Sequence, residues 1–181
     1  MDLLNITDML GIGMGLLTGG FLKASLQQGA GPTNIYSGND ALNDENEAAS
    51  LPTISADANM SVALESVDTD LGAYAVKFTH TGGVNVATDQ YIDLPGLANN
   101  TAYTVKYRFK RLSGSNNWSM QLEAGGNWSS GSAVGSHTTS YAEYTLTGTT
   151  AASGTPKFRV RGTSSADGGD SFLISMIFVQ L

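Results

Sequence analysis

The 181-residue chain has no cysteine and only two histidines, His80 and His137. Without cysteine there is no disulfide framework, no Cys-ligated zinc or iron–sulfur site and no thiol nucleophile. We expect both histidines at the surface, beside the ends of strands. The sequence offers no nucleophile–base pair, no glutamate pair at a recognisable spacing and no cofactor loop, so we expect a protein that is not an enzyme.

Charge is also scarce, at 14% of residues, and it is unevenly distributed. Residues 1–70 hold ten acidic side chains and one basic side chain, whereas residues 71–181 hold six acidic and eight basic ones. The net charge of -7 does not favour binding to nucleic acid. The asymmetry is compatible with solubility, with steering of a partner or with pairing of opposite charges inside the chain.

Long apolar runs are missing too. The apolar charge-free stretch near the start, residues 9–22, has fourteen residues, and a bilayer-spanning helix needs about 20. The opening carries Asp2 and Asp8 in place of a basic segment, which is atypical of a secretory signal. We therefore expect no membrane span and no signal peptide.

Residues 1–32 form an apolar, glycine-rich arm. On a helix, glycines four residues apart would make a smooth stripe against which another backbone packs closely. Glycine costs about 1 kcal/mol relative to alanine at each helical position, so such a helix needs a partner surface. That surface is either the chain's own domain or another subunit, and the candidate oligomerisation residues are Gly11, Gly15, Gly19, Leu16 and Phe21.

The rest of the chain divides at residue 60. Residues 33–59 are an acidic, weakly periodic lead-in with at most one short strand. From residue 60 apolar and polar residues alternate with a period of two, and Gly, Asn and Pro separate the runs. This pattern predicts an antiparallel β-sandwich of the jelly-roll kind without helices. The expected strands are 61–67, 73–80, 90–94, 102–112, 117–124, 141–147, 157–162 and 171–180.

Basic residues fall on the outward side of two of these strands. In residues 102–112, Tyr103, Val105 and Tyr107 alternate with cations, as do Phe158 and Val160 in residues 157–162. We expect one basic face that carboxylates from residues 34–70, of the same chain or a neighbouring one, neutralise through at least two ion pairs. The alternatives are that an acidic polysaccharide neutralises it or that its side chains extend into solvent. Its members are Lys106, Arg108, Lys110, Arg159 and Arg161.

Four passages resemble the jelly-roll carbohydrate-binding modules attached to xylanases and glucanases. They are GAYAVKFTHTGG (72–83), QYIDLPGLANNTAYTVKYRFKR (90–111), SYAEYTLTGTT (140–150) and DSFLISMIFVQL (170–181). The resemblance covers residues 60–181 and implies a sandwich that binds carbohydrate. That family usually has an aspartate after the isoleucine of its last strand, which often helps to hold calcium, and this chain has Ser175 there. We therefore expect no cofactor and no metal; a calcium site would depend on Asp68, Asp70, Asp167 and Asp170.

Sugars have apolar ring faces and a hydroxyl rim, so their sites combine an aromatic side chain with amides or charges. Trp128 lies among Gly and Ser and is either a contact residue with partial exposure or a lid. Trp118 alternates with Met120 and Leu122, which favours the core. The candidate ligand-binding residues are Trp128, Trp118, Asn117, Asn127, Arg108 and Arg159. Tyr91 has no clear face in the pattern, and the resemblance places Tyr141 in the core.

An arm that needs a partner, joined to a binding module, is typical of a virion structural protein of a bacteriophage. The arm would dock into capsid or tail, and the module would face outward as a decoration protein or short fibre. The expected partners are other virion proteins, further copies of the chain in a closed ring such as a trimer, and a host glycan. The alternative is a cell-surface or enzyme-associated carbohydrate-binding module.

Overall fold

Ten strands and no helix make up the part of the chain that the structure describes. The computed structural model describes residues 33–181, apart from 44, 46, 57, 84–87, 115–117, 125–126, 129–137 and 163–167. The arm, with Gly11, Gly15, Gly19, Leu16 and Phe21, lies outside the described residues. Within that described part, no helix is long and apolar enough to cross a membrane.

Each of the eight expected runs overlaps a strand, which confirms the all-β prediction. The strands are β1 Ile54–Ala56, β2 Met60–Glu65, β3 Ala75–His80, β4 Thr88–Asp93, β5 Ala102–Ser113, β6 Trp118–Ala124, β7 Asn127–Trp128, β8 Ala142–Thr149, β9 Lys157–Gly162 and β10 Ser171–Gln180. β1 is the one short strand expected in the lead-in, whereas the two-residue β7 has no signal in the sequence.

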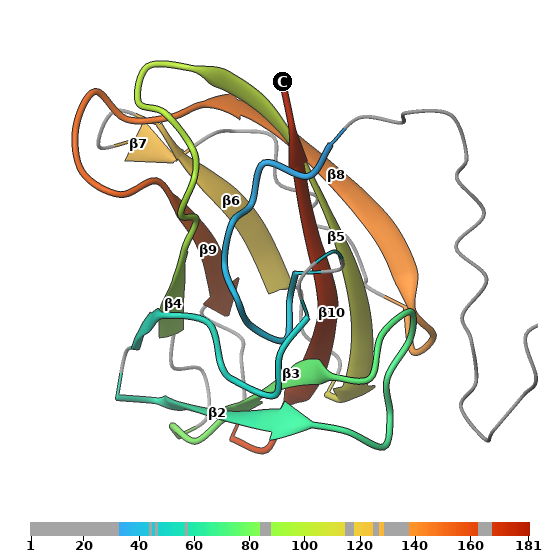
Figure 1. Ribbon diagram of the computed structural model, residues 1–181. Coiled ribbons are helices and arrows are strands. Elements are labelled where there is room, and N and C mark those ends of the chain that lie inside the picture. Colours follow the sequence, from blue (N-terminus) through green and yellow to red (C-terminus); the bar gives the residue numbers. More distant parts are fainter. Residues whose placement is uncertain are drawn as a thin grey trace, which may run out of the picture. The chain divides into compact units, whose positions relative to one another are not determined.

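The strands form two antiparallel five-stranded sheets in a jelly-roll sandwich (Figure 1). One sheet has the order β1-β4-β9-β6-β7 and the other β2-β3-β10-β5-β8. Because successive side chains of a strand point to opposite faces, every second one lies between the two sheets. Aromatic contacts join the layers: Tyr107 of β5 meets Phe158 of β9 at 5.3 Å between ring centroids, and Trp118 of β6 meets Phe172 of β10 at 4.5 Å.

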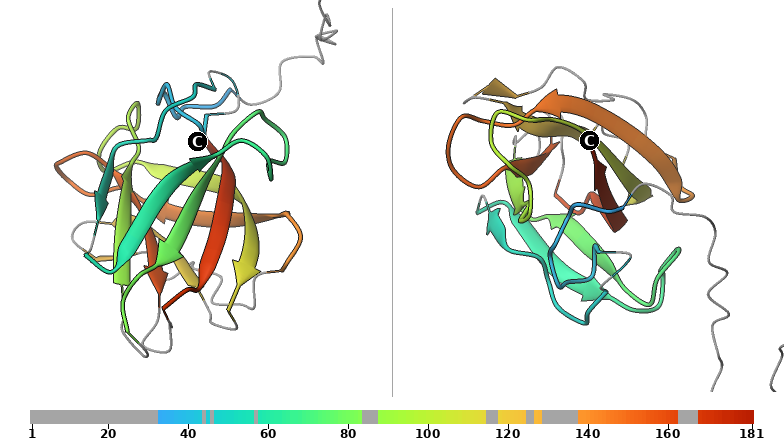
Figure 2. Two further views of the ribbon diagram at one scale, coloured as in Figure 1. Left: turned by 90° about the horizontal axis from the view of Figure 1, so that it is seen from below. Right: turned by 45° about the horizontal axis from the view of Figure 1, so that its top comes forward.

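The lead-in is part of the sandwich. Tyr36, Ala41 and Leu42 are buried, and residues 32–181 form one compact unit. The lead-in runs beside the second half of β10, near the carboxyl terminus (Figure 2). Ile35 N donates to Val179 O, and Ile177 N donates to Leu42 O, both at 2.8 Å. A segment without strand periodicity therefore supplies β10 with backbone partners.

Asn34 completes this contact because its side-chain amide imitates a peptide group. Its Oδ1 accepts from Val179 N at 2.9 Å, and its Nδ2 donates to Ile177 O at 3.2 Å. The same Oδ1 also accepts from Tyr36 N. Asn34 thus satisfies β10 backbone groups beyond the stretch of β10 that pairs with β3. β10 is buried along both of its rows for most of its length.

His80 corrects one expectation from the sequence. It is the last residue of β3, and its side chain is 1% exposed, so it is not a surface residue. Its backbone N donates to Asp170 O at 2.8 Å, and its O accepts from Gly169 N at 2.9 Å. These two residues, just before β10, cover the end of β3, which the sequence pattern predicts to be exposed. His137 lies outside the described residues.

Gly96, in the Pro95–Gly96 turn after β4, gives a testable prediction. Its φ is +93°, and an added Cβ would lie 2.5 Å from the carbonyl oxygen of Ile35 in the lead-in. Gly154 has a similar φ of +86° with nothing within 4 Å of the added Cβ. We expect Gly96→Ala to lower the free energy of unfolding by about 2–4 kcal/mol and Gly154→Ala by about 1 kcal/mol, since only the first adds a clash to backbone strain. Urea unfolding measures both, and equal losses would contradict the packing of the lead-in on this turn.

Candidate functional site

The outer side of the β1-β4-β9-β6-β7 sheet carries a row of polar and aromatic side chains from three neighbouring strands. Because Ile92, Phe158 and Leu122 are core residues, their strand neighbours point outward. The register aligns Tyr91 with Arg159, and Arg159 with Gln121. We call this surface the arginine face; its members are Asp89, Tyr91, Asp93, Gln121, Lys157, Arg159 and Arg161.

Arg159 lies at the centre of the arginine face, on the middle strand β9. Only 6% of the residue is exposed, although it points away from the core. Its Nη2 donates to Gln121 Oε1, and its side chain also hydrogen bonds Tyr91. Burial lowers the pKa of the Arg159 guanidinium, and the nearby Asp89 carboxylate opposes that shift. Arg159 therefore fixes the orientation of the ring and the amide beside it.

Two carboxylates pair with the three cations of the arginine face. Asp93 Oδ1 accepts from Lys157 Nζ at 2.8 Å, which is a direct hydrogen-bonded ion pair. Asp89 lies 3.7 Å from both Arg159 and Arg161, beyond direct hydrogen-bond distance. From Asp89 to Asp93 the face extends about 13 Å along the strand. Tyr91, half-buried, is the aromatic group in the middle of this stretch.

The structure separates the predicted ligand-binding residues. Trp118 is fully buried against Phe172, so it belongs to the core and its ring cannot contact a ligand at the surface. Its alternation with Met120 and Leu122 favours this position. Asn117 lies outside the described residues. In the backbone of β7, Trp128 lies opposite Glu123 of β6. The side chains of Asn127 and Trp128 lie outside the described part, so the expected exposure of Trp128 stays a prediction.

The expected single basic face is wrong in its arrangement, because β5 and β9 belong to different sheets. Lys106, Arg108 and Lys110 lie on the outer side of the second sheet, and we call that surface the lysine face. Arg108 is thus on the opposite side of the sandwich from Arg159. Sequence alternation shows which residues point outward, but it does not show which sheet a strand joins.

The predicted neutralisation by residues 34–70 is confirmed. Arg108 Nε donates to Asp70 Oδ2, and Lys110 Nζ lies 2.6 Å from Asp68 Oδ2. These two acids follow β2. The lead-in carboxylates have other roles: Glu47 accepts from the backbone N of Ala73 and Tyr74, and Asp40 accepts from Tyr36 and Leu42.

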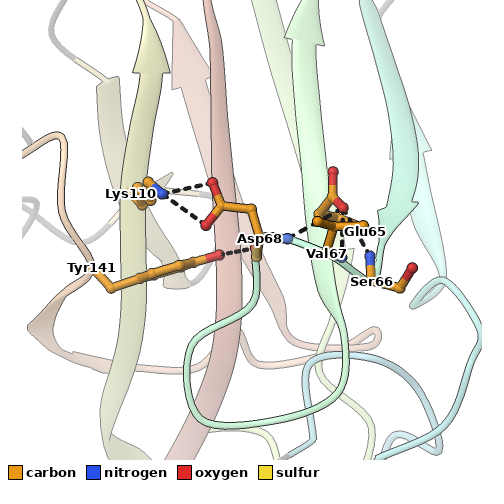
Figure 3. A network of polar contacts seen from close by, with 6 residues as sticks. All are labelled: Glu65, Ser66, Val67, Asp68, Lys110 and Tyr141. Carbon is orange, nitrogen blue, oxygen red and sulfur yellow. Dashed lines mark hydrogen bonds and ion pairs between the residues drawn. The ribbon is translucent and has the colours of Figure 1, made fainter.

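Asp68 also organises the loop after β2 (Figure 3). The Tyr141 hydroxyl donates to the backbone O of Asp68 at 2.8 Å, and Lys110 Nζ lies 5.5 Å from the centre of the Tyr141 ring. Burial raises the pKa of Tyr141, and the nearby Asp68 raises it further. Tyr141, half-buried, therefore anchors this loop over the lysine face, outside the main core cluster.

Glu65 at the end of β2 carries a pH prediction. Its Oε1 accepts from the backbone N of Val67 at 2.8 Å, and from Ser66 and Asp68 (Figure 3). These bonds, led by the one from Val67, lower its pKa below the ordinary 4.5. A lowered pKa favours the folded loop above pH 4.5, and this contribution disappears as the pH falls through the folded-state pKa. An NMR titration of the Glu65 carboxyl should give a midpoint below 4.5; a midpoint at or above 4.5 would contradict the turn.

Calcium has no evident site in the described part of the chain. Asp68 and Asp70 hold cationic side chains, and Asp167 lies outside the described residues. Within the described ranges no group of three or more Asp, Glu or His residues could hold a metal ion. The expected absence of a cofactor stays a prediction.

Sequence reasoning missed Tyr91 and Gln121 as members of one site. The inward positions of β4 include Thr88 and Gln90, which are polar yet buried. Because β4 lacks the usual apolar alternation, its sequence does not show that Tyr91 points outward. Gln121 and Lys157 do alternate with core residues, but they are brought to Tyr91 only by the strand order. Arg159 is the one predicted ligand-binding residue whose described side chain belongs to this face.

Comparison with known proteins gives a fold but no sequence family. No protein-family model matches the chain, and no curated protein matches it in sequence. The xylan-binding CBM22-1 domain of Xyn10C from Paenibacillus barcinonensis matches with a TM-score of 0.53 and 11% identity, over 82% of this chain and 90% of that domain. A further CBM22 xylan-binding domain matches with a TM-score of 0.52 and 11% identity, over 74% and 89%.

A third similar structure holds such a module within an enzyme. It is the CBM22-1–GH10 part of xylanase 10B from Clostridium thermocellum, complexed with xylohexaose. The TM-score is 0.52 and the identity 8%, over 71% of this chain and 26% of that one. At such identities the likeness concerns the fold alone. This chain therefore has the jelly-roll fold of carbohydrate-binding modules of the CBM22 type.

Proposed function

We propose that this protein is a non-enzymatic carbohydrate-binding protein and that the arginine face holds the glycan. The observation that carries the proposal is the row Tyr91–Arg159–Gln121 across three strands, an aromatic ring beside groups that pair with hydroxyls. The jelly-roll fold supports it by analogy. Three cations against two carboxylates suit a neutral or acidic glycan.

The chemistry of the face supports binding over catalysis. Both of its carboxylates are engaged in ion pairs, Asp93 with Lys157 and Asp89 with Arg159 and Arg161. A general acid or base must be free to exchange a proton with a substrate. Carboxylates paired in this way serve instead as fixed hydrogen-bond acceptors for hydroxyl groups.

The experiment is affinity electrophoresis and calorimetry of the full chain against xylan, other neutral polysaccharides and acidic polysaccharides. We expect Tyr91→Ala to weaken binding at least about tenfold, because the ring supplies the apolar contact. Arg108→Ala is the matched control, since it also removes a half-buried side chain that is engaged with a neighbour, but on the lysine face. Unchanged binding by Tyr91→Ala together with loss in Arg108→Ala would place the site on the opposite sheet and contradict the proposal.

We further propose that the binding module belongs to a bacteriophage virion structural protein, exposed for attachment or stabilisation. The support is the glycine-rich sequence of residues 1–32, which needs a partner surface. In this arrangement the arm joins copies of the chain, as a trimer or another closed ring, to other virion proteins. The second candidate is an enzyme-associated or cell-surface module, which the likeness to a module within a xylanase chain favours.

A further inference from the structure

A polar cavity of about 440 Å³ lies at the end of β4, next to the arginine face. Three segments line it: residues 36–40 of the lead-in, residues 51–53 before β1, and the end of β4 at Asp93 and Pro95; Thr155, before β9, completes the wall. Its volume is at the lower end of the range of about 300–1,000 Å³ that ligand pockets occupy. It is large enough for a small polar molecule.

The cavity has a buried floor and an exposed rim. Asp40 is buried, with Oδ2 accepting from the Tyr36 hydroxyl and Oδ1 accepting from Leu42 N at 2.8 Å. Burial raises the pKa of Tyr36, and the Asp40 hydrogen bond raises it further, so the phenol remains a donor. The rim is exposed and rich in hydroxyl and amide groups, from Ser37, Asn39, Thr53 and Thr155.

Asp93 connects the cavity to the arginine face. It lines the cavity, it is the last member of the outward row Asp89–Tyr91–Asp93, and its Oδ1 accepts from Lys157. Its backbone N donates to Thr53 O at 3.0 Å, which fixes the cavity wall beside the row. A molecule that lies along the row therefore reaches the cavity at Asp93.

The lead-in lies next to the row on the far side of Asp93. Ser37 N donates to Pro95 O at 3.0 Å, so the lead-in lies directly against the chain just beyond the end of β4. A chain-like ligand that follows the row past Asp93 meets the lead-in at this contact, which favours an end unit in the cavity. The apolar surfaces of Pro52 and Pro95 suit the CH face of a ring, and the hydroxyl-bearing rim suits its edge.

We propose that this cavity binds the terminal sugar of a glycan whose following units lie on the arginine face, so that the protein recognises chain ends. The inference rests on the proposed function, and it adds a subsite and a mode of recognition. Two carboxylates at the cavity, Asp40 and Asp93, disfavour a terminal sugar that carries an acid. The terminal unit is therefore a neutral sugar.

The test uses the full chain with xylohexaose, cellohexaose and the corresponding polysaccharides. We expect the number of protein molecules bound by a polysaccharide to rise in proportion to the chain ends that partial hydrolysis creates. Thr155→Trp fills the cavity from its exposed rim, and it should weaken hexaose binding at least tenfold. Thr145→Trp is the matched control, because Thr145 is exposed on β8 of the other sheet and should bind as the parent does.

The outcomes separate the inference from the proposed function. If Tyr91→Ala abolishes binding, while Thr155→Trp has no effect and stoichiometry follows polysaccharide mass, the arginine face stands and chain-end recognition is wrong. If Thr155→Trp and Thr145→Trp lose binding equally, the cavity is not the subsite. If neither xylan nor any other neutral or acidic polysaccharide binds the parent chain, both the proposed function and this inference are overturned.

Discussion

Removal of residues 1–50 is expected to abolish cooperative folding, whereas removal of residues 1–30 should leave the sandwich intact. The larger deletion takes away Tyr36, Ala41 and Leu42, which are buried in the core. Each large apolar side chain contributes about 1.5–3 kcal/mol through burial. The hydrogen bonds from residues 34–42 to β10 are lost as well. The combined loss approaches the 5–15 kcal/mol by which a typical domain is stable.

Urea unfolding followed by tryptophan fluorescence and amide NMR would measure the difference. Leu42→Ala in the full chain provides a finer variant, with an expected loss of about 2–5 kcal/mol from one fully buried leucine. A protein lacking residues 1–50 that unfolded cooperatively at the parent's midpoint would contradict the role of the lead-in. So would a protein lacking residues 1–30 that failed to fold.

Comparison of the full chain with the protein lacking residues 1–30 also tests the arm. We expect light scattering to give a multimer for the full chain and a monomer for residues 31–181, because the glycine stripe needs a partner surface. If the protein lacking residues 1–30 kept the same number of subunits, the arm would not be the assembling element. A monomeric full chain would remove the support for a virion ring and favour the enzyme-associated module.

The sequence predicts the sandwich well because alternation and turn residues are local signals. Strand β5 has core residues at every second position, with Lys106 and Arg108 between them, and its pattern could be followed directly. The lead-in has no such period. Its buried residues are held by side chains that bond backbone groups. Asp40 accepts from Leu42 N two residues on, which is a local turn pattern, but Asn43 bonds Tyr36 O seven residues back and Asn34 bonds Val179 N 145 residues away. Its position along β10 therefore could not be predicted.

The candidate site could be predicted only in part, because strand order is a long-range property. Arg159 and Arg108 both point outward from alternating strands, yet the topology places them on opposite sides of the sandwich. Tyr91 comes beside Arg159 through the pairing of β4 with β9, whose residues are 68 positions apart along the chain at this row. Nothing local to either strand encodes that pairing.

Phe172→Ala is expected to lower the free energy of unfolding by about 3–5 kcal/mol. The ring is fully buried on β10 and stacks on Phe78 of β3 at 4.9 Å and on Phe109 of β5 at 4.8 Å between centroids. Trp118 of the opposite sheet also contacts it. Truncation leaves a cavity that rings from both sheets border, and rigid rings cannot collapse into it.

Urea denaturation of the variant measures this loss. Leu71→Ala serves as a control, because Leu71 is 62% exposed and its truncation should change stability by less than about 0.5 kcal/mol. A loss below 1 kcal/mol in Phe172→Ala would show that the aromatic cluster is not tightly packed. Equal losses in the two variants would have the same meaning.

A double-mutant cycle then tests whether Phe172 and Trp118 join the two sheets. Phe172→Leu and Trp118→Phe each keep an apolar side chain in place, so the fold survives while the contact between the rings changes. Their ring centroids lie 4.5 Å apart, with planes inclined by 53°. We expect the two losses to be non-additive by about 0.5–1.5 kcal/mol, which is the usual strength of a buried aromatic pair. Additive losses within 0.3 kcal/mol, the scatter found between independent sites, would mean that the sheets are held together elsewhere, with the contact of Tyr107 and Phe158 as the next candidate.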